Sequence, residues 1–413
     1  MRIFKRLAAA SSAAFISHTL AIPFIVHPGG ANDVVIISQD TLNETISNHG
    51  PCQATTPLSA GDAEQLSVSV QNNFQSDSVH VFITGLDFDG NIVCLTPSGS
   101  WYTPTGDSSS TTPQEITEDI AIPIGAYGTT TSLTLPRYFL SGRIWVADGD
   151  LTFWTVISAT GVLSLVEPSA VNPDDSSANV NWGFVELTTD SSGITVNLSY
   201  VDFVGLPLGI EVQGSDGTQT ALGVSADALS SICNDLATQA SSDGQPWNEL
   251  CMTDTSGNVL RVIAPYYYIS LEPDAFDSYW TSYVSNVWSQ YETTPLTIDT
   301  QAAAGLINCT VSSGTLNCDG DNRGYAQPDA SDIFGCNSGS FTIESSDNDV
   351  HKAVVPRLCA AFNRKSVHQH EADGKGYAFA YDDVTPDGVL NASGLLSDPN
   401  PTLLTITVGG PTS

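Results

Sequence analysis

Basic residues are scarce in this sequence. Its 413 residues include 12 Lys and Arg against 45 Asp and Glu, which gives a formal net charge of -33 at pH 7. A surface this acidic repels phosphate backbones and anionic lipids, so the composition argues against nucleic acid or a membrane as a partner. A neutral polymer is the kind of partner that suits this charge.

Long apolar stretches are absent beyond the N-terminus. Arg2, Lys5 and Arg6 precede a mostly apolar stretch from Leu7 to Ala21. This layout is typical of a signal peptide and is too short for a membrane span. We therefore expect residues 1–21 to be removed and the protein to be secreted. Loss of the three basic charges would take the formal net charge from -33 to about -36.

Cysteines and glycosylation sequons also favour an extracellular location. The chain has eight cysteines, and an even number in an exported chain indicates disulfides. A two-residue turn at Ser313-Gly314 would place Cys309 directly opposite Cys318, so this disulfide is predicted. Further candidate pairings are Cys52 with Cys94, Cys233 with Cys251, and Cys336 with Cys359; the sequons begin at Asn43, Asn197, Asn308 and Asn391.

Short β-type runs dominate the sequence up to residue 212 and return near its C-terminus. They alternate apolar and polar residues, and turn signals separate them, so the chain is predicted to be mainly β. The runs include Leu66 to Val70, His80 to Thr84, Gly142 to Val146, Leu151 to Ile157, Tyr377 to Tyr381 and Leu403 to Val408.

Helical periodicity appears between the β-type regions. Ser225 can cap one helix, and a second is expected from near Asp274, with an aromatic stripe that we interpret as packing. A third pattern lies closer to the C-terminus. The apolar positions are Leu229, Ile232, Cys233 and Leu236; Phe276, Trp280, Tyr283, Val287 and Trp288; and Val355, Leu358, Cys359 and Phe362.

These patterns predict a β-rich body that a helical excursion interrupts. The expected divisions are a signal peptide over 1–21, the first part of a β-barrel domain over 22–212, a mixed α/β excursion over 213–335, and a return to the barrel with C-terminal strands over 336–413.

Two carboxylates stand among apolar residues in neighbouring strand-like segments. Glu186 lies in a predicted strand from Val180 to Thr188, and Asp202 in one from Ile194 to Val204. An ionised carboxylate buried in such surroundings costs several kcal/mol, roughly, unless it is paired or used. Neither strand contains Lys or Arg, so these two carboxylates are candidate functional groups.

The loop between the strands decides whether the carboxylates share a face. A three-residue loop with Gly193 left-handed would pair Asp190 with Ile194 and place Glu186 opposite Leu198. Asp202 would then lie on the same face as Glu186, together with Trp182, Phe184, Thr188 and Tyr200. A four-residue loop would separate the two carboxylates.

Such a pair suits glycoside cleavage. One carboxyl group must hold a proton for the leaving oxygen while the other is ionised to take a proton from water. Four residues of strand span about 13 Å, which side chains can close to the ~6.5–9.5 Å of an inverting pair. Trp182, Phe184 and Tyr200 would stack on sugars and Thr188 would bond hydroxyls. The alternative is two half-exposed carboxylates that solvate a sheet surface.

The residues around this pair resemble glycoside hydrolase family 64, the β-1,3-glucanases. The segment Tyr200 to Ile210, YVDFVGLPLGI, resembles that family's stretch, and Trp182 to Glu186 is similar to the strand that carries its catalytic glutamate. Thaumatin-like proteins show a fainter resemblance, in Gly142 to Trp145 and Tyr377 to Asp383. Their middle cleft acid is replaced here by Asn197.

The resemblance implies a function and a set of site residues. Glu186 would be the general acid and Asp202 the general base of an inverting hydrolysis of β-1,3-glucan, such as laminarin or cell-wall glucan. Arg143 and Asp383 would lie in or beside the groove. The implied fold is a thaumatin-like β-barrel or sandwich with an inserted mixed α/β region and a wide cleft between them. The register with the three-residue loop points the Asn197 sequon away from that cleft.

Other functions remain as alternatives at this stage. One is a non-catalytic thaumatin-like protein that binds glucan in defence, and another is a structural wall protein with an acidic surface.

The stretch from His368 to Glu371 lacks a third spaced ligand, and Cys318 to Gly324 lacks the closing Glu of a calcium loop. We therefore expect no metal and no cofactor, and a monomeric enzyme.

Overall fold

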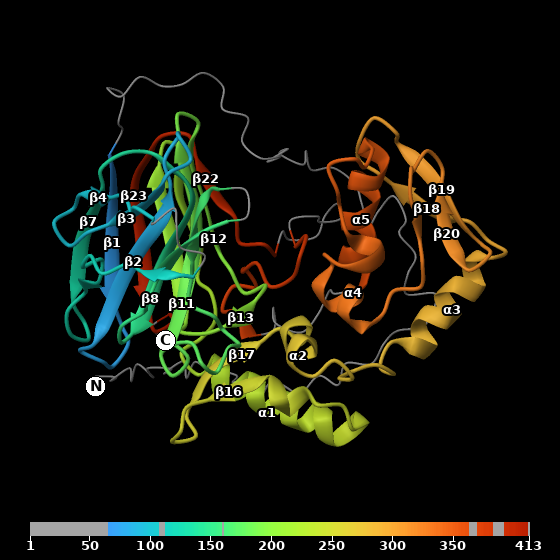
Figure 1. The fold of residues 1–413 in the computed structure, drawn as a ribbon, viewed down its shortest axis with the longest axis horizontal. Helices are drawn as coiled ribbons and strands as arrows, with labels where there is room; N and C mark the ends of the chain where they lie inside the picture. The colour runs from blue at the N-terminus through green and yellow to red at the C-terminus, as the bar shows by residue number, and fades with distance from the viewer. Residues whose placement is uncertain (1–64, 107–111, 159–160, 363–369, 383–391, 412–413) are drawn as a thin grey trace, which may run out of the picture.

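The computed structural model describes residues 65–106, 112–158, 161–362, 370–382 and 392–411. The predicted signal peptide and the sequons at Asn43 and Asn391 lie outside these residues. Strands predominate, as predicted, and they form a β body on one side of the molecule (Figure 1). A smaller unit of helices and a separate sheet stands on the other side.

The β body contains two large sheets. An eight-stranded sheet has the order β22-β12-β11-β8-β2-β3-β4, with β6 paired to β2. A five-stranded sheet has the order β15-β14-β23-β1-β7. The eight strands are β2 (Val79–Leu86), β3 (Ile92–Leu95), β4 (Trp101–Tyr102), β6 (Ile122–Pro123), β8 (Phe139–Asp148), β11 (Asn181–Asp190), β12 (Gly193–Leu198) and β22 (Leu396–Asp398). The five are β1 (Leu66–Asn72), β7 (Thr130–Leu135), β14 (Leu208–Gly214), β15 (Gly217–Ala221) and β23 (Pro401–Val408).

Alternation of apolar and polar residues forms the core between these sheets. In β1, Leu66, Val68 and Val70 are buried while Ser67 is exposed. Predicted strands at Leu66, His80, Gly142 and Leu403 are confirmed, while the one predicted from Leu151 to Ile157 begins only at Trp154. The same alternation also turns every second side chain of β11 and β12 away from the core, which is how the sheet presents polar groups on its other face.

Three smaller sheets complete the strands. The order β10-β9-β5 joins β10 (Leu163–Val166), β9 (Trp154–Ile157) and β5 (Gln114–Glu115). The order β13-β17-β16 joins β13 (Phe203–Val204), β17 (Val259–Ile263) and β16 (Cys251–Thr253). The order β18-β19-β20-β21 joins β18 (Leu296–Asp299), β19 (Leu306–Ser312), β20 (Thr315–Cys318) and β21 (Gly324–Tyr325).

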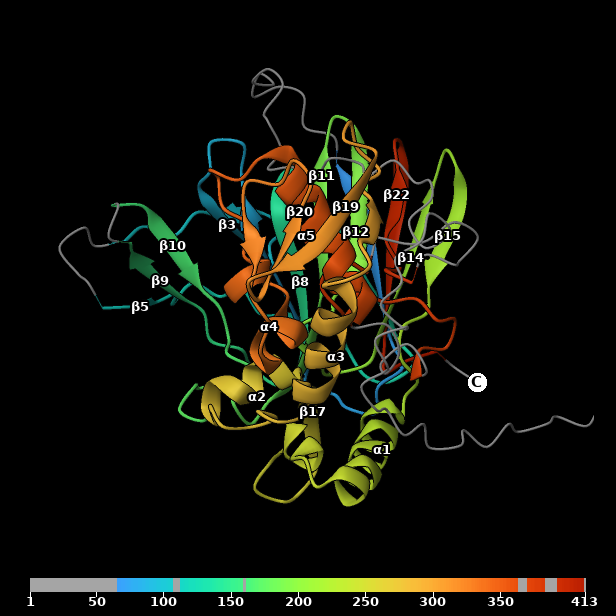
Figure 2. The same ribbon diagram turned by 90° about the vertical axis from the view of Figure 1, so that its right-hand side faces the viewer.

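Along the chain, the helices lie between β15 and β22. They are α1 (Ala228–Asp243), α2 (Pro265–Leu271), α3 (Thr281–Tyr291), α4 (Ala330–Gly335) and α5 (Asp349–Phe362), with 3-10 turns η2 (Trp247–Leu250) and η3 (Gly339–Phe341). In Figure 1 the unit of α3 to α5 and β18 to β20 stands beside β12, and in Figure 2 it lies in front of β8, β11 and β12. The two views together place this unit across from the face of the eight-stranded sheet.

The three predicted helices exist, with two shifted starts. The first begins after Asp227 rather than Ser225, because the Ser225 carbonyl accepts a turn bond from the Ala228 N–H at 3.0 Å. The second begins at Thr281 rather than near Asp274, because Phe276 has a left-handed φ of 61° that no helix accommodates. The residues of the predicted aromatic stripe are buried, which confirms their interpretation as packing, although Phe276 and Trp280 precede the helix.

The predicted strand from Tyr377 to Tyr381 is wrong. Only an isolated bridge joins Tyr377 to Ser199. The Asp382 carboxylate accepts hydrogen bonds from the Ala378 and Phe379 N–H groups at 2.7 and 2.8 Å, and Tyr381 has a φ of 67°. This local carboxylate bonding folds the segment into a turn.

Three predicted disulfides are present. Cys309 and Cys318 are directly opposite in the β19–β20 hairpin, with Ser312 paired to Thr315 as the predicted turn requires. The other two join Cys233 to Cys251 and Cys336 to Cys359. The candidate pairing of Cys94 with Cys52 is untested because Cys52 lies outside the described residues.

Candidate active site

Glu186 faces away from the core because of the register of β11. Its neighbours Val185 and Leu187 are buried in the sheet interior, so alternation turns Glu186 and Thr188 outward. Glu186 is flanked by Arg143 of β8 on one side and Asn197 of β12 on the other. Three neighbouring strands thus converge on one carboxylate.

The predicted register of the β11–β12 hairpin is wrong. Asp190 pairs with Gly193, so the turn contains two residues, and Glu186 lies opposite Asn197 instead of Leu198. Core packing explains this, because Val185 and Leu198 are paired and both fully buried. The Asp190 carboxylate also accepts the Ser192 N–H at 2.7 Å, which closes the shorter turn.

Asp202 does not lie in the predicted strand. β12 ends at Leu198, and the chain then leaves the hairpin before β13 pairs with β17. The Asp202 carbonyl accepts the Ala264 N–H at 2.9 Å, and its carboxylate accepts a hydrogen bond from Tyr267 of α2. Burial raises the pKa of Asp202, with the Glu186 charge adding to the rise, while Tyr267 and Arg143 oppose it. The two predicted carboxylates therefore interact electrostatically.

Glu167 is a third carboxylate in this site, and the sequence analysis missed it. It follows β10 directly, and its Oε2 is paired with Nη1 of Arg143. Burial raises the pKa of Glu167 and the Glu186 and Asp202 charges add to the rise, while Arg143 opposes it. Its position beside Pro168, just after a strand of a separate sheet, gives no periodic signal that sequence reasoning could use.

A pocket of about 440 Å³ opens over Glu186. This volume lies within the ~300–1,000 Å³ usual for ligand sites. Polar groups that can bond sugar hydroxyls surround the carboxylates. The lining consists of Ser141, Gly142, Arg143, Glu167, Glu186, Leu187, Thr188, Thr195 and Asn197.

Arg143 and Thr188, two of the predicted substrate-binding residues, line the pocket. Asn197 lines it too, and its Nδ2 lies 3.5 Å from Oε2 of Glu186. The expectation that the Asn197 sequon points away is therefore wrong, since it depended on the other register. Asp383 lies outside the described residues.

The predicted aromatic platform is not exposed to a ligand. Trp182 and Phe184 are 2% and 4% exposed, and they pack with Trp145 and Phe203 in one aromatic cluster. Phe184 lies under the Arg143 guanidinium, 4.7 Å from its ring centroid. Both rings share the outward face of β11 with Glu186, but a guanidinium covers each of them, Arg143 over Phe184 and Arg261 over Trp182.

Tyr200 is likewise buried, contrary to a role in stacking on sugar. It is 7% exposed, and its hydroxyl lies 3.5 Å from the Leu208 carbonyl and accepts the Val224 N–H at 3.3 Å. The chain has left the hairpin before Tyr200, so the Tyr200 side chain packs between strands.

Neither a metal site nor a membrane helix is found in the part of the chain that the structure describes. No group of three or more His, Cys, Asp or Glu side chains is arranged to hold a metal ion there. No helix there is long and apolar enough to cross a membrane.

Comparison with known proteins gives a consistent family. The model of glycoside hydrolase family 64, described as β-1,3-glucanase, matches residues 64–367 and 365–408. Glucan endo-1,3-β-glucosidases of Cellulosimicrobium cellulans and Arthrobacter sp. strain YCWD3 are each 25% identical over 289 and 288 residues, 61% of this chain and 50% of each relative. The chain thus spans about half the length of the curated relatives it matches.

Solved structures show the same fold. A laminaripentaose-producing β-1,3-glucanase in complex with laminaritetraose is 25% identical and superimposes with a TM-score of 0.71, over 83% of this chain and 98% of that one. A family 64 β-1,3-glucanase domain from Clostridium beijerinckii is 20% identical with a TM-score of 0.62, over 86% of this chain and 100% of that one.

Proposed function

The chain belongs to glycoside hydrolase family 64, and from this membership we propose that it is a secreted hydrolase that cleaves β-1,3-glucan. The observation that supports this most is the pocket over Glu186, which Arg143 and Glu167 also line, together with the interaction between the charges of Asp202 and Glu186. The related structure in complex with laminaritetraose supports the substrate class.

In this proposal Glu186 is the general acid and Asp202 the general base of an inverting reaction. Glu186 gives its proton to the leaving glycosidic oxygen, and ionised Asp202 takes a proton from the water that attacks the opposite face of the sugar. A raised pKa suits a base, because a more basic carboxylate accepts a proton more readily. Activity is then lost as the pH falls through the pKa of Asp202.

Substrate contacts are proposed for the polar lining of the pocket. Arg143 and Thr188 remain substrate-binding candidates, and Ser141, Thr195 and Asn197 join them. We extend the proposal to the thaumatin-like architecture, in which this pocket continues into a wide cleft between the β body and the unit of α3 to α5. The position of that unit across from the sheet supports it (Figures 1 and 2).

Laminarin hydrolysis by matched variants tests the catalytic proposal. Glu186→Gln and Asp202→Asn are each expected to lower kcat by at least about 100-fold, because each removes one proton-transfer group. Glu115→Gln removes an exposed carboxylate of β5 and is expected to match the wild type. A wild type that binds laminarin without releasing reducing sugar would contradict the enzymatic function and favour the binding-protein alternative.

The stereochemistry of the product tests the mechanism separately. An inverting pair must release the α-anomer first, which NMR of the earliest laminarin products detects. First release of the β-anomer would contradict the roles given to Glu186 and Asp202 while leaving a glucanase in place.

Secretion remains part of the proposal. The three disulfides support it, since disulfides persist in oxidising compartments. Mass spectrometry of protein recovered from the culture medium is expected to show a chain that begins after Ala21, and full-length protein retained in the cytoplasm would contradict it.

A further inference from the structure

The Arg143 guanidinium in the pocket donates hydrogen bonds to two carboxylates. The Nε and Nη2 atoms of Arg143 donate to Oε1 of Glu186 at 3.3 and 3.1 Å, and its Nη1 donates to Oε2 of Glu167. Arginine does not lose its proton in proteins, so Arg143 places a fixed positive charge between the two acids. Each carboxylate therefore changes how strongly the other is paired.

This arrangement resolves a conflict in the chemistry of Glu186. A general acid must hold a proton, yet an arginine beside a carboxylate favours the ionised form. The negative charge of Asp202, which also interacts with Glu186, acts in the opposite direction. Glu167 supplies a second negative charge. It is paired with the same guanidinium and opposes ionisation of Glu186.

The two partners of Arg143 come from different sheets. Glu186 lies in β11 next to β8, which carries Arg143, whereas Glu167 follows the β9–β10 pair of the smaller sheet. Figure 2 shows β9 and β10 projecting to one side of the molecule. The ring of Phe184 lies under the guanidinium and limits its movement toward the core. Glu167 thus holds Arg143 from the side, and it is still 32% exposed at its side chain.

We propose that Glu167 is a positioning residue that holds the Arg143 guanidinium and shares its charge, so that Glu186 can carry the proton needed by the leaving group. This inference rests on the proposed function of Glu186 as general acid. Glu167 itself transfers no proton in this scheme. It acts through Arg143.

A titration of Glu186 tests the inference without turnover. Protein labelled with ¹³C at glutamate carboxyls is titrated by NMR as wild type, Glu167→Gln and Glu167→Asp, and Glu186→Gln assigns the signal. Glu167→Gln is expected to lower the pKa of Glu186 by about 0.5–1 unit, the size expected for one charge at a partly exposed site. The basic limb of the kcat/KM profile on laminarin is expected to move to lower pH by the same amount.

The conservative variant separates charge from packing. Glu167→Asp keeps the charge and is expected to shift the Glu186 titration by less than half as much as Glu167→Gln. Glu115→Gln, which removes a carboxylate of the same small sheet, is expected to leave it unchanged. An unshifted or raised Glu186 pKa in Glu167→Gln, or equal shifts in both Glu167 variants, would overturn the inference. Absence of wild-type turnover on laminarin would instead contradict the proposed function. The titration measures the charge sharing independently of turnover.

Discussion

Asp202 is held by contacts from two directions. Its backbone carbonyl bonds the residue before α2, and its carboxylate accepts a hydrogen bond from Tyr267 of that helix. Burial makes ionisation of Asp202 costly, and the Tyr267 hydroxyl offsets part of this cost because it bonds to the ionised form. The proton affinity of the proposed base therefore depends on a short helix that the sequence analysis did not identify.

Loss of the Tyr267 hydroxyl is expected to change the pH dependence of catalysis. Tyr267→Phe removes a hydrogen bond to a charged group, so the pKa of Asp202 rises further, by about 1 unit. Since the base must be ionised, the acidic limb of the kcat/KM profile moves to higher pH by that amount. Laminarin assays between pH 3 and 8 measure it.

Tyr266→Phe is the matched control for this variant. The Tyr266 ring packs edge-on against Tyr267 with centroids 5.5 Å apart, so the control removes a neighbouring hydroxyl from the same turn. Its acidic limb is expected to coincide with that of the wild type. A shift equal to that of Tyr267→Phe would show that the bond to Asp202 is not responsible.

Single residues of the site were predictable to different degrees. Glu186 became a candidate because its carboxylate interrupts an apolar strand that has no Lys or Arg, and the motif around Asp202 resembled a known family. Trp182 and Phe184 were misjudged because period-two alternation gives the face of a residue but not what covers that face. Here Arg143 covers Phe184, and a cross-strand cation cannot be assigned before the strand order is known.

The two hairpins show what fixes register at the scale of elements. In β19–β20, the turn at Ser313-Gly314 and the two cysteines required one pairing, and the structure has it. In β11–β12, several turn lengths were compatible with Asp190 to Gly193. Burial of Val185 and Leu198 together decided between them, and the turn residues alone did not contain that information.

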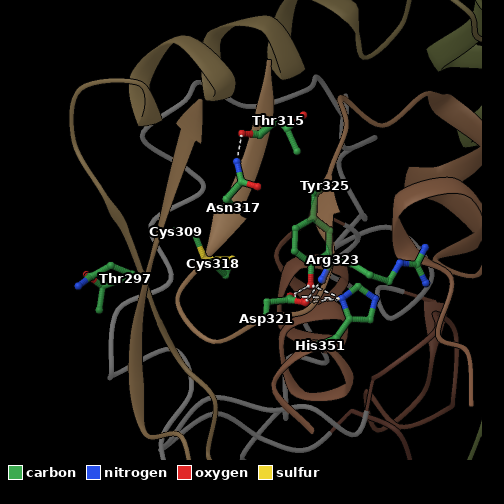
Figure 3. Close-up of a disulfide and its surroundings, with 10 residues drawn as sticks. Thr297, Cys309, Thr315, Asn317, Cys318, Asp321, Arg323, Tyr325 and His351 are labelled. Atoms are coloured by element: carbon green, nitrogen blue, oxygen red, sulfur yellow. Dashed lines mark hydrogen bonds and ion pairs between the residues drawn. A yellow bond between two sulfur atoms is a disulfide. The ribbon is translucent and has the colours of Figure 1, made fainter. Parts of the chain in front are cut away.

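A buried polar cluster joins β21 to α5 beside the Cys309–Cys318 disulfide (Figure 3). The Tyr325 hydroxyl donates to Asp321 at 2.6 Å, and Asp321 also bonds Nδ1 of His351 at 3.0 Å. Both the Asp321 and His351 side chains are fully buried. Burial raises the pKa of Tyr325, and its bond to Asp321 raises it further, so its hydroxyl stays protonated and donates.

Removal of that hydroxyl is expected to destabilise the protein. Tyr325→Phe keeps the ring and its packing but leaves a buried carboxylate short of one donor, which costs about 1.5–3 kcal/mol of unfolding free energy. Urea denaturation followed by fluorescence measures the loss. Tyr127→Phe, at a side chain that is 54% exposed, is expected to stay within about 0.5 kcal/mol of the wild type. Equal stability of the two variants would contradict this account of the cluster.

At the scale of the whole molecule, negative charge is the dominant feature. The chain carries a formal net charge of -33 at pH 7, and only 12 basic residues are present to pair with its acids. Most carboxylates therefore repel one another across the surface. Such self-repulsion opposes the compact state and is screened by salt.

Salt is accordingly expected to stabilise the folded protein at neutral pH. Raising NaCl from 20 to 500 mM at pH 7 shortens the Debye length to a few ångströms, and we expect the midpoint of thermal unfolding to rise by about 2–4 °C. Differential scanning calorimetry measures it. The same salt step near the sequence pI of about 4.1 is the control, where the net charge is small and the rise is expected to vanish. An equal rise at both pH values would assign the effect to something other than charge.

The mainly β architecture could be predicted because strand alternation and turn residues are local signals. The division of the chain into consecutive segments stays a prediction. In the structure β15 of the five-stranded sheet extends to Ala221, and α5 extends to Phe362. Which sheets face the site depends on contacts between distant segments, such as Arg143 with Glu167, that no local pattern contains.

The location of Asn197 bears on how the protein can be manufactured. A eukaryotic secretory pathway that modifies Asn-X-Ser would install a branched oligosaccharide on a side chain within 3.5 Å of Glu186, in the lining of the proposed substrate pocket. We expect material from such a host to contain a heavier fraction in which this pocket is obstructed. Expression in a bacterial periplasm, where disulfides form without this modification, avoids the obstruction.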